Sequence, residues 1–177
     1  MKKIFVLFLL ISPCIIFSQM TKRDSLWLLL KPFVGEWKGD GGGQPGKGKY
    51  ERSYQFILNK RFIEIRNKST YEPTTQHPNG EVHEDIGYFS YDNTRKTFML
   101  RQFHVESFVI QYRIDSISAD KRTIVFISES IENIPSGYRA KETYRLISDN
   151  EIEETFEIAE PNKEFAAYSK VKLVRQK

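Results

Sequence analysis

The segment YERSYQFILNKRFIEIRNK, residues 50–68, contains two alternating runs joined by a short turn. In the first run every second residue lies on one largely apolar face, and these residues are Tyr50, Arg52, Tyr54, Phe56 and Leu58. A turn at Asn59 and Lys60 leads into the second run, where Ile63 and Ile65 alternate with charged residues. Because successive side chains of a strand point to opposite faces, this segment predicts an antiparallel hairpin with one buried and one solvated face.

The same period-two pattern recurs along the chain, in runs that begin near Phe108 and Tyr138. Between Glu36 and Arg175 the alternation and the turns between runs predict about ten short strands. So many antiparallel strands in one small chain hide their edges most simply by closing on themselves. We therefore predict an all-β fold, a ten-stranded antiparallel up-and-down β-barrel, with a short N-terminal helix over residues 26–30 that Pro32 ends.

The first 19 residues have the composition of a secretory signal peptide. Lys2 and Lys3 precede an apolar run, and a cleavage site follows near Ser18 or Gln19. This predicts a signal peptide over residues 1–19, a single barrel domain over 20–177, and export to the periplasm or the outside of the cell, with no membrane span in the mature protein. The alternative is a lipoprotein anchored through Cys14, which is less favoured because a proline precedes that cysteine and an apolar run follows it.

The composition of the mature chain excludes several classes of function. Removal of the signal lowers the formal charge from +4 to +2, which is too weak a balance to predict binding to nucleic acid. Cys14 is the only cysteine and leaves with the signal. The mature protein therefore has no disulfide, no thiolate nucleophile and no cysteine–zinc site.

A glycine-rich run, DGGGQPGKG, occupies residues 40–48. It lacks the Lys-Ser/Thr of a phosphate-binding loop, and no helix follows it. We predict a flexible connection at the rim of the barrel.

Two carboxylates interrupt the apolar faces of their strands. Glu142 lies between Ala140 and Tyr144, and Glu154 occupies an equivalent position in the next run. A buried carboxylate is costly unless it is paired or hydrated, so a partly hydrated pocket or an arginine partner such as Arg52 is expected. A bulge that turns one glutamate outward is the alternative.

Several polar and aromatic residues are candidates for binding a ligand inside the barrel. His83 and His104 are the candidate polar groups of a cavity, and Arg52 and Arg101 are candidate partners for an anionic ligand group. By alternation Tyr54 and Tyr112 face inward, where they either line a pocket or fill a core. Trp37 is expected to seal the barrel under the N-terminal helix and, secondarily, to contact the ligand.

The histidines show no spacing that is typical of a metal site. None of them lies in an H-E-x-x-H motif or beside a second histidine at strand spacing. His83 and Asp85 share a strand face, which is enough to orient an imidazole but falls short of a metal site. We predict no metal site from these residues.

Two motifs resemble those of nitrobindin-like β-barrels. Residues 33–41, FVGEWKGDG, resemble the G-x-W-x-G-x-G opening of that family, and residues 83–89, HEDIGYF, resemble its H-x-E-x-G-Y-F/W strand with Asp85 in place of the glutamate. The resemblance implies a ten-stranded calycin-type barrel that holds haem b, with chemistry on nitric oxide and peroxynitrite.

The last strand departs from the family pattern. Haem-binding members present a histidine there, in a pattern like H-L-x-A-x-L, whereas residues 168–173 are YSKVKL. Tyr168 therefore stands at the position of the axial ligand, and tyrosinate is a known ligand of ferric haem. Alternation, however, places Tyr168 on the same face as Lys170 and Lys172, which predicts that it faces solvent.

Three functions remain open at this point. We favour an exported barrel that binds a small hydrophobic or amphipathic molecule. The second is a haem protein that acts on nitric oxide or peroxynitrite, with Tyr168 as the iron ligand. The third is a filled barrel with an interaction or structural role.

Overall fold

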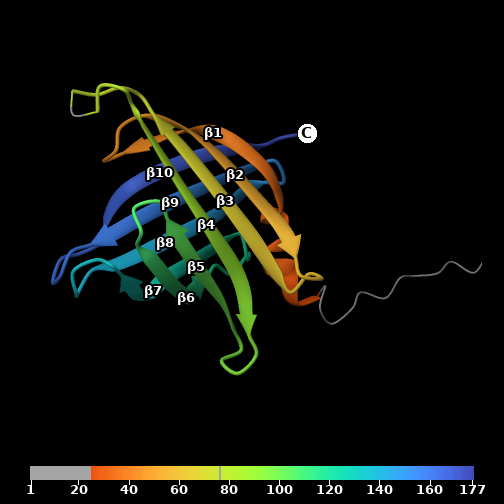
Figure 1. Cartoon of the computed structure of the whole chain (residues 1–177). Helices are drawn as coiled ribbons and strands as arrows, with labels where there is room; N and C mark the ends of the chain where they lie inside the picture. Colours follow the sequence, from red (N-terminus) through yellow and green to blue (C-terminus); the bar gives the residue numbers. More distant parts are fainter. Residues whose placement is uncertain (1–24, 76) are drawn as a thin grey trace, which may run out of the picture.

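The computed structural model describes residues 25–75 and 77–177, in which ten antiparallel strands form a closed barrel (Figure 1). The strands are β1 (Gly35–Gly43), β2 (Gly48–Ile57), β3 (Phe62–Tyr71), β4 (Glu81–Asp92), β5 (Thr97–His104), β6 (Val109–Ile117), β7 (Thr123–Glu132), β8 (Arg139–Ser148), β9 (Glu151–Ala159) and β10 (Ala166–Arg175). Each strand pairs with its neighbours in sequence, and β1 pairs with β10 to close the barrel. The predicted fold class is confirmed.

The closing seam depends on the glycine-rich segment. This segment is mostly strand, because β1 runs to Gly43 and leaves only a tight turn before β2. A Cβ atom on Gly39 would lie 1.9 Å from the carbonyl oxygen of Lys172, and one on Gly43 would lie 1.9 Å from that of Tyr168. Because glycine has no Cβ atom, the backbones of β1 and β10 can lie closer together here than any other residue would allow. The predicted flexible connection is therefore wrong over residues 40–43.

Residues 25 and 26 are α-helical, and from residue 27 on the predicted N-terminal helix gives way to two 3₁₀ turns, η1 (Trp27–Leu29) and η2 (Lys31–Phe33). Pro32 supplies no backbone N–H, so an α-helix cannot continue through it. The turns close one end of the barrel, as expected for the helix. Trp27 is buried there, with ring centroids 5.7 Å from Phe56 and 5.2 Å from Phe98.

Below these turns the barrel is solid. Tyr54, Phe89, Phe126 and Tyr144 are buried on four different strands, and their rings contact one another across the interior. Phe33 from η2 packs edge-on against Tyr144. This half of the barrel matches the filled interior of the third hypothesis, whereas the opposite half is hollow.

Some predictions fall outside the described residues. The signal peptide over residues 1–19, and with it the alternative anchor at Cys14, lies in a part of the chain that the structure does not describe. Among the described residues, none of the helices has the length and apolar character that crossing a membrane requires.

Candidate ligand-binding cavity

The hollow end of the barrel, opposite the N-terminal turns, encloses a cavity of about 350 Å³. This volume lies within the range of about 300–1,000 Å³ that is typical of small-molecule sites. Its apolar walls come from β6, β9 and β10 and include Ile110, Phe156, Ile158 and Val171. Polar side chains from β2, β3, β4, β5, β8 and β9 form the rest of the wall and the floor.

A buried ion pair lies at the floor. Arg52 on β2 donates through Nε to Glu154 Oε2 on β9 at 3.0 Å, and both side chains are more than nine-tenths buried. The Nη1 group of Arg52 also donates to the carbonyl oxygens of Glu51 and Lys68, and the Tyr54 hydroxyl donates to Glu154. The inward Glu154 therefore has the arginine partner that its position on an apolar face requires.

Two further carboxyls, those of Glu142 and Asp85, lie near this pair. Burial raises the pKa of Glu142 well above its usual value, and the neighbouring carboxylates of Glu154 and Asp85 raise it further. Burial also raises the pKa of Asp85 to about 6, although the positive charge of Arg52 acts in the opposite direction. The floor thus holds three carboxyls and one guanidinium.

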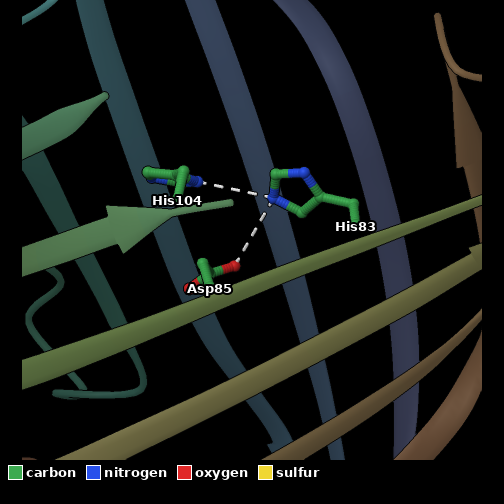
Figure 2. A group of neighbouring side chains, drawn as sticks. All are labelled: His83, Asp85 and His104. Atoms are coloured by element: carbon green, nitrogen blue, oxygen red, sulfur yellow. Dashed lines mark hydrogen bonds and ion pairs between the residues drawn. The ribbon is translucent and has the colours of Figure 1, made fainter. Parts of the chain in front are cut away.

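Figure 2 shows a second polar group, on the wall formed by β4 and β5. His83 and Asp85 share the inner face of β4 because they are two residues apart, and the strand register places His104 of β5 opposite Asp85. The Nε2 atom of His83 lies 3.7 Å from Asp85 Oδ2 and 3.4 Å from His104 Nδ1.

His104 is held as a neutral imidazole. Its ring stacks on Phe108 with centroids 4.1 Å apart, and burial together with the neighbouring His83 lowers its pKa to about 3. Its Nε2 atom is buried and has no hydrogen-bond partner among the described residues. His83 is more open, and its Nδ1 atom lies 2.6 Å from Glu106 Oε1 in the turn after β5.

Tyr168 lies in the lining of the cavity, and the prediction that it faces solvent is wrong. The pairing of β9 with β10 shifts register between Ala167 and Ser169, so a bulge interrupts the alternation at Tyr168. Its ring packs edge-on against Phe156 with centroids 5.6 Å apart.

The other predicted site residues lie outside the cavity lining. Tyr54 and Tyr112 are buried in the barrel interior, and the indole N–H of Trp37 donates to the carbonyl of Phe33 at 2.7 Å, which ties β1 to the N-terminal turns. Arg101 is on the outer face of β5, where it donates to Gln111 and Ser90. The expectation that Arg101 faces the interior is corrected, because it alternates with the buried Leu100 and Gln102.

Sequence reasoning did not single out three polar residues that line the cavity, Asn67, Ser69 and Gln102. Asn67 Nδ2 donates to Asp85 Oδ1 at 2.8 Å. The sequence does contain a feature that points to Asn67 and Ser69. The apolar face of Ile63 and Ile65 continues with these two polar residues. Such interruptions mark a hydrated interior in the same way as the two inward glutamates.

A closed antiparallel barrel with one solid and one hollow end has the architecture of the ligand-binding barrels. The chain belongs to the THAP4-like, heme-binding beta-barrel domain family, whose model matches residues 27–175. The nitrobindin-like resemblance is thereby confirmed. No curated protein matches the chain.

Solved structures include similar folds. Rv2717c from M. tuberculosis is 16% identical with a TM-score of 0.61, and the match covers 86% of this chain and 98% of that chain. A de novo designed fluorescence-activating β-barrel is 14% identical with a TM-score of 0.43, covering 82% of this chain and 95% of the design. At these identities the likeness to Rv2717c shows the fold alone.

The family name implies haem, and the residue that stands at the family's ligand position, Tyr168, does not fit a haem-iron ligand. Burial raises the pKa of Tyr168, and the nearby Tyr71, Glu81 and Glu106 raise it further, so the tyrosinate form is disfavoured. We therefore derive no chemistry through haem.

Proposed function

We propose that this protein is an exported binding protein whose barrel encloses a small amphipathic molecule. The observation that carries the proposal is the cavity of about 350 Å³, apolar on one side and polar at its floor. An apolar ligand body packs against Phe156, Ile158 and Val171, and its polar end reaches the floor. The solid aromatic half of the barrel supplies a rigid base for this site.

The floor favours a ligand whose polar end donates hydrogen bonds. The charge of Arg52 is already balanced by Glu154, and Asp85 adds a carboxylate that is ionised above its pKa of about 6. A carboxylate ligand would meet like charge there, whereas an amine or hydroxyl would find acceptors. The ligand class is therefore an alkyl or aryl amine or alcohol.

Competition between matched ligands tests this proposal. The protein produced from the full chain is loaded with a neutral apolar fluorophore, which is then displaced by decylamine or by decanoate. We expect decylamine to displace the dye at a concentration at least tenfold lower at pH 8, and Asp85→Asn to reduce that preference. Tighter binding of decanoate would contradict the assigned polarity, and the absence of dye binding would contradict the cavity as a binding site.

Haem is the second candidate, favoured by the family match. Titration of the protein with haemin distinguishes the two. We expect no sharp Soret band at one equivalent. A stoichiometric band that disappears in Tyr168→Phe would instead establish the haem protein with a tyrosinate ligand.

Export is the remaining part of the proposal, and it rests on the signal-like composition of residues 1–19. N-terminal sequencing of the protein from its own host tests it. A mature chain that begins at residue 19 or 20 is expected. A mature chain that begins at a lipid-modified Cys14 would establish the anchored form, and an intact Met1 would contradict export.

A further inference from the structure

The wall between β4 and β5 brings together two imidazoles and one carboxylate, and we propose that His83, Asp85 and His104 bind a divalent transition-metal ion. One ligand atom from each residue lies within 4.8 Å of the others. Two histidines with one carboxylate form a donor set that binds zinc and ferrous iron in proteins. This inference goes beyond small-molecule binding and does not depend on it.

The separations of the donor atoms suit a tetrahedral ion. With metal–ligand bonds of about 2.0–2.1 Å, tetrahedral ligands lie about 3.3 Å apart. His83 Nε2 is 3.4 Å from His104 Nδ1 and 3.7 Å from Asp85 Oδ2. The remaining pair, His104 Nδ1 and Asp85 Oδ2, lies within 4.8 Å, so side-chain rotations are needed to bring all three atoms onto one ion.

Two of the three donors already have the outer partners that metal ligands require. Glu106 accepts a hydrogen bond from His83 Nδ1 at 2.6 Å, which fixes the tautomer that leaves the lone pair of Nε2 free. Asp85 is oriented in the same way, because Asn67 donates to its Oδ1 and leaves Oδ2 for the ion. Stacking on Phe108 fixes the ring plane of His104.

The site is open to an incoming ion and to a ligand. The side chain of His83 is 22% exposed, whereas that of Asp85 is 7% exposed, so the ion enters from the His83 side. All three residues line the cavity. Three protein ligands leave a fourth position for water or for a donor atom of a cavity ligand.

Zinc binding to the protein produced from the full chain tests the proposal. Metal-free protein is dialysed against Zn²⁺, and the bound metal is measured by elemental analysis, with Co²⁺ as an optical probe of coordination. We expect one equivalent bound with a micromolar or lower Kd and tetrahedral Co²⁺ bands. His83→Gln, Asp85→Asn and His104→Gln should each weaken binding more than a hundredfold, and Glu106→Gln should weaken it about tenfold to a hundredfold.

His77→Gln is the matched control, since His77 is exposed and forms a contact only with Glu81 among the ion pairs of the described chain. It should bind zinc like the wild type. The partly exposed Glu106 provides a variant that does not disturb the barrel interior. Absence of stoichiometric zinc binding by the wild type, or equal loss in His77→Gln and His83→Gln, would overturn the proposal.

Discussion

At the residue scale, the most consequential feature is a charged cluster inside a small barrel. Arg52 and Glu154 are buried together, and each would be left unpaired if the other were removed. The desolvation of an unpaired charge, more than the attraction within the pair, sets the cost of removing one partner.

Glu154→Ala should lower the free energy of unfolding by about 3–5 kcal/mol because it leaves Arg52 buried without its carboxylate. Glu51→Ala is the control, since Glu51 pairs with Lys38 at 2.6 Å on the exposed face. That change should cost about 1 kcal/mol or less. Urea denaturation of both variants measures the difference, and equal losses would contradict a structural role for the buried pair.

The raised pKa of Glu142 predicts a pH-dependent stability. Above the ordinary carboxyl pKa of 4.5 the unfolded chain releases this proton while the folded protein retains it, so stability falls as pH rises toward the folded pKa. Glu142→Gln should therefore stabilise the protein relative to wild type, and by more at pH 8 than at pH 4. Denaturant titrations at both pH values check this, and a difference that does not change with pH would contradict it.

At the element scale, the strands and their alternation were predictable and their interruptions were not. The hairpin of residues 50–68 forms with Ile63 and Ile65 buried, as its period-two pattern predicts. The predicted orientation of Tyr168 toward solvent is wrong because a bulge adds one residue to β10 and shifts the alternation. The amino-acid composition of the strand gives no sign of this bulge. The glycine-rich run was misassigned because glycine marks both a loop and a close approach of strands.

The closing seam gives a prediction for β1. Gly39→Ala places a methyl group against the Lys172 carbonyl and should destabilise the barrel by about 1–3 kcal/mol or more. Gly42→Ala is the control on the opposite face of the same strand, where the nearest atom to the added Cβ is 3.3 Å away. Thermal unfolding compares the two, and an equal shift would show that crowding at the seam is not the cause.

The candidate site was only partly predictable from sequence. Arg52 and His83 could be placed inside the barrel from alternation alone. The contact between His83 and His104 could not be predicted, because it depends on the register between β4 and β5. No local sequence pattern reveals that register. The predicted inward orientation of Arg101 is wrong because the inward positions of β5 are those of its neighbours Leu100 and Gln102.

At the scale of the whole molecule, one end of the barrel interior is packed with side chains and the other end is open for a ligand. The 3₁₀ turns and the aromatic rings fill one end, while the other end keeps a cavity with a charged floor. Closure of β1 onto β10 removes both sheet edges, so the barrel needs no covalent crosslink. The hollow end is therefore the part of the molecule that we propose holds a small molecule.

Native mass spectrometry of the protein purified from its own host shows whether a small molecule occupies the hollow end. Val171→Trp fills the cavity from β10, and Val174→Trp adds the same side chain to the exposed face of the same strand. We predict a bound small-molecule mass in the wild type and in Val174→Trp that is lost in a folded Val171→Trp. A wild-type protein that carries no added mass, or a mass retained in Val171→Trp, would contradict the account.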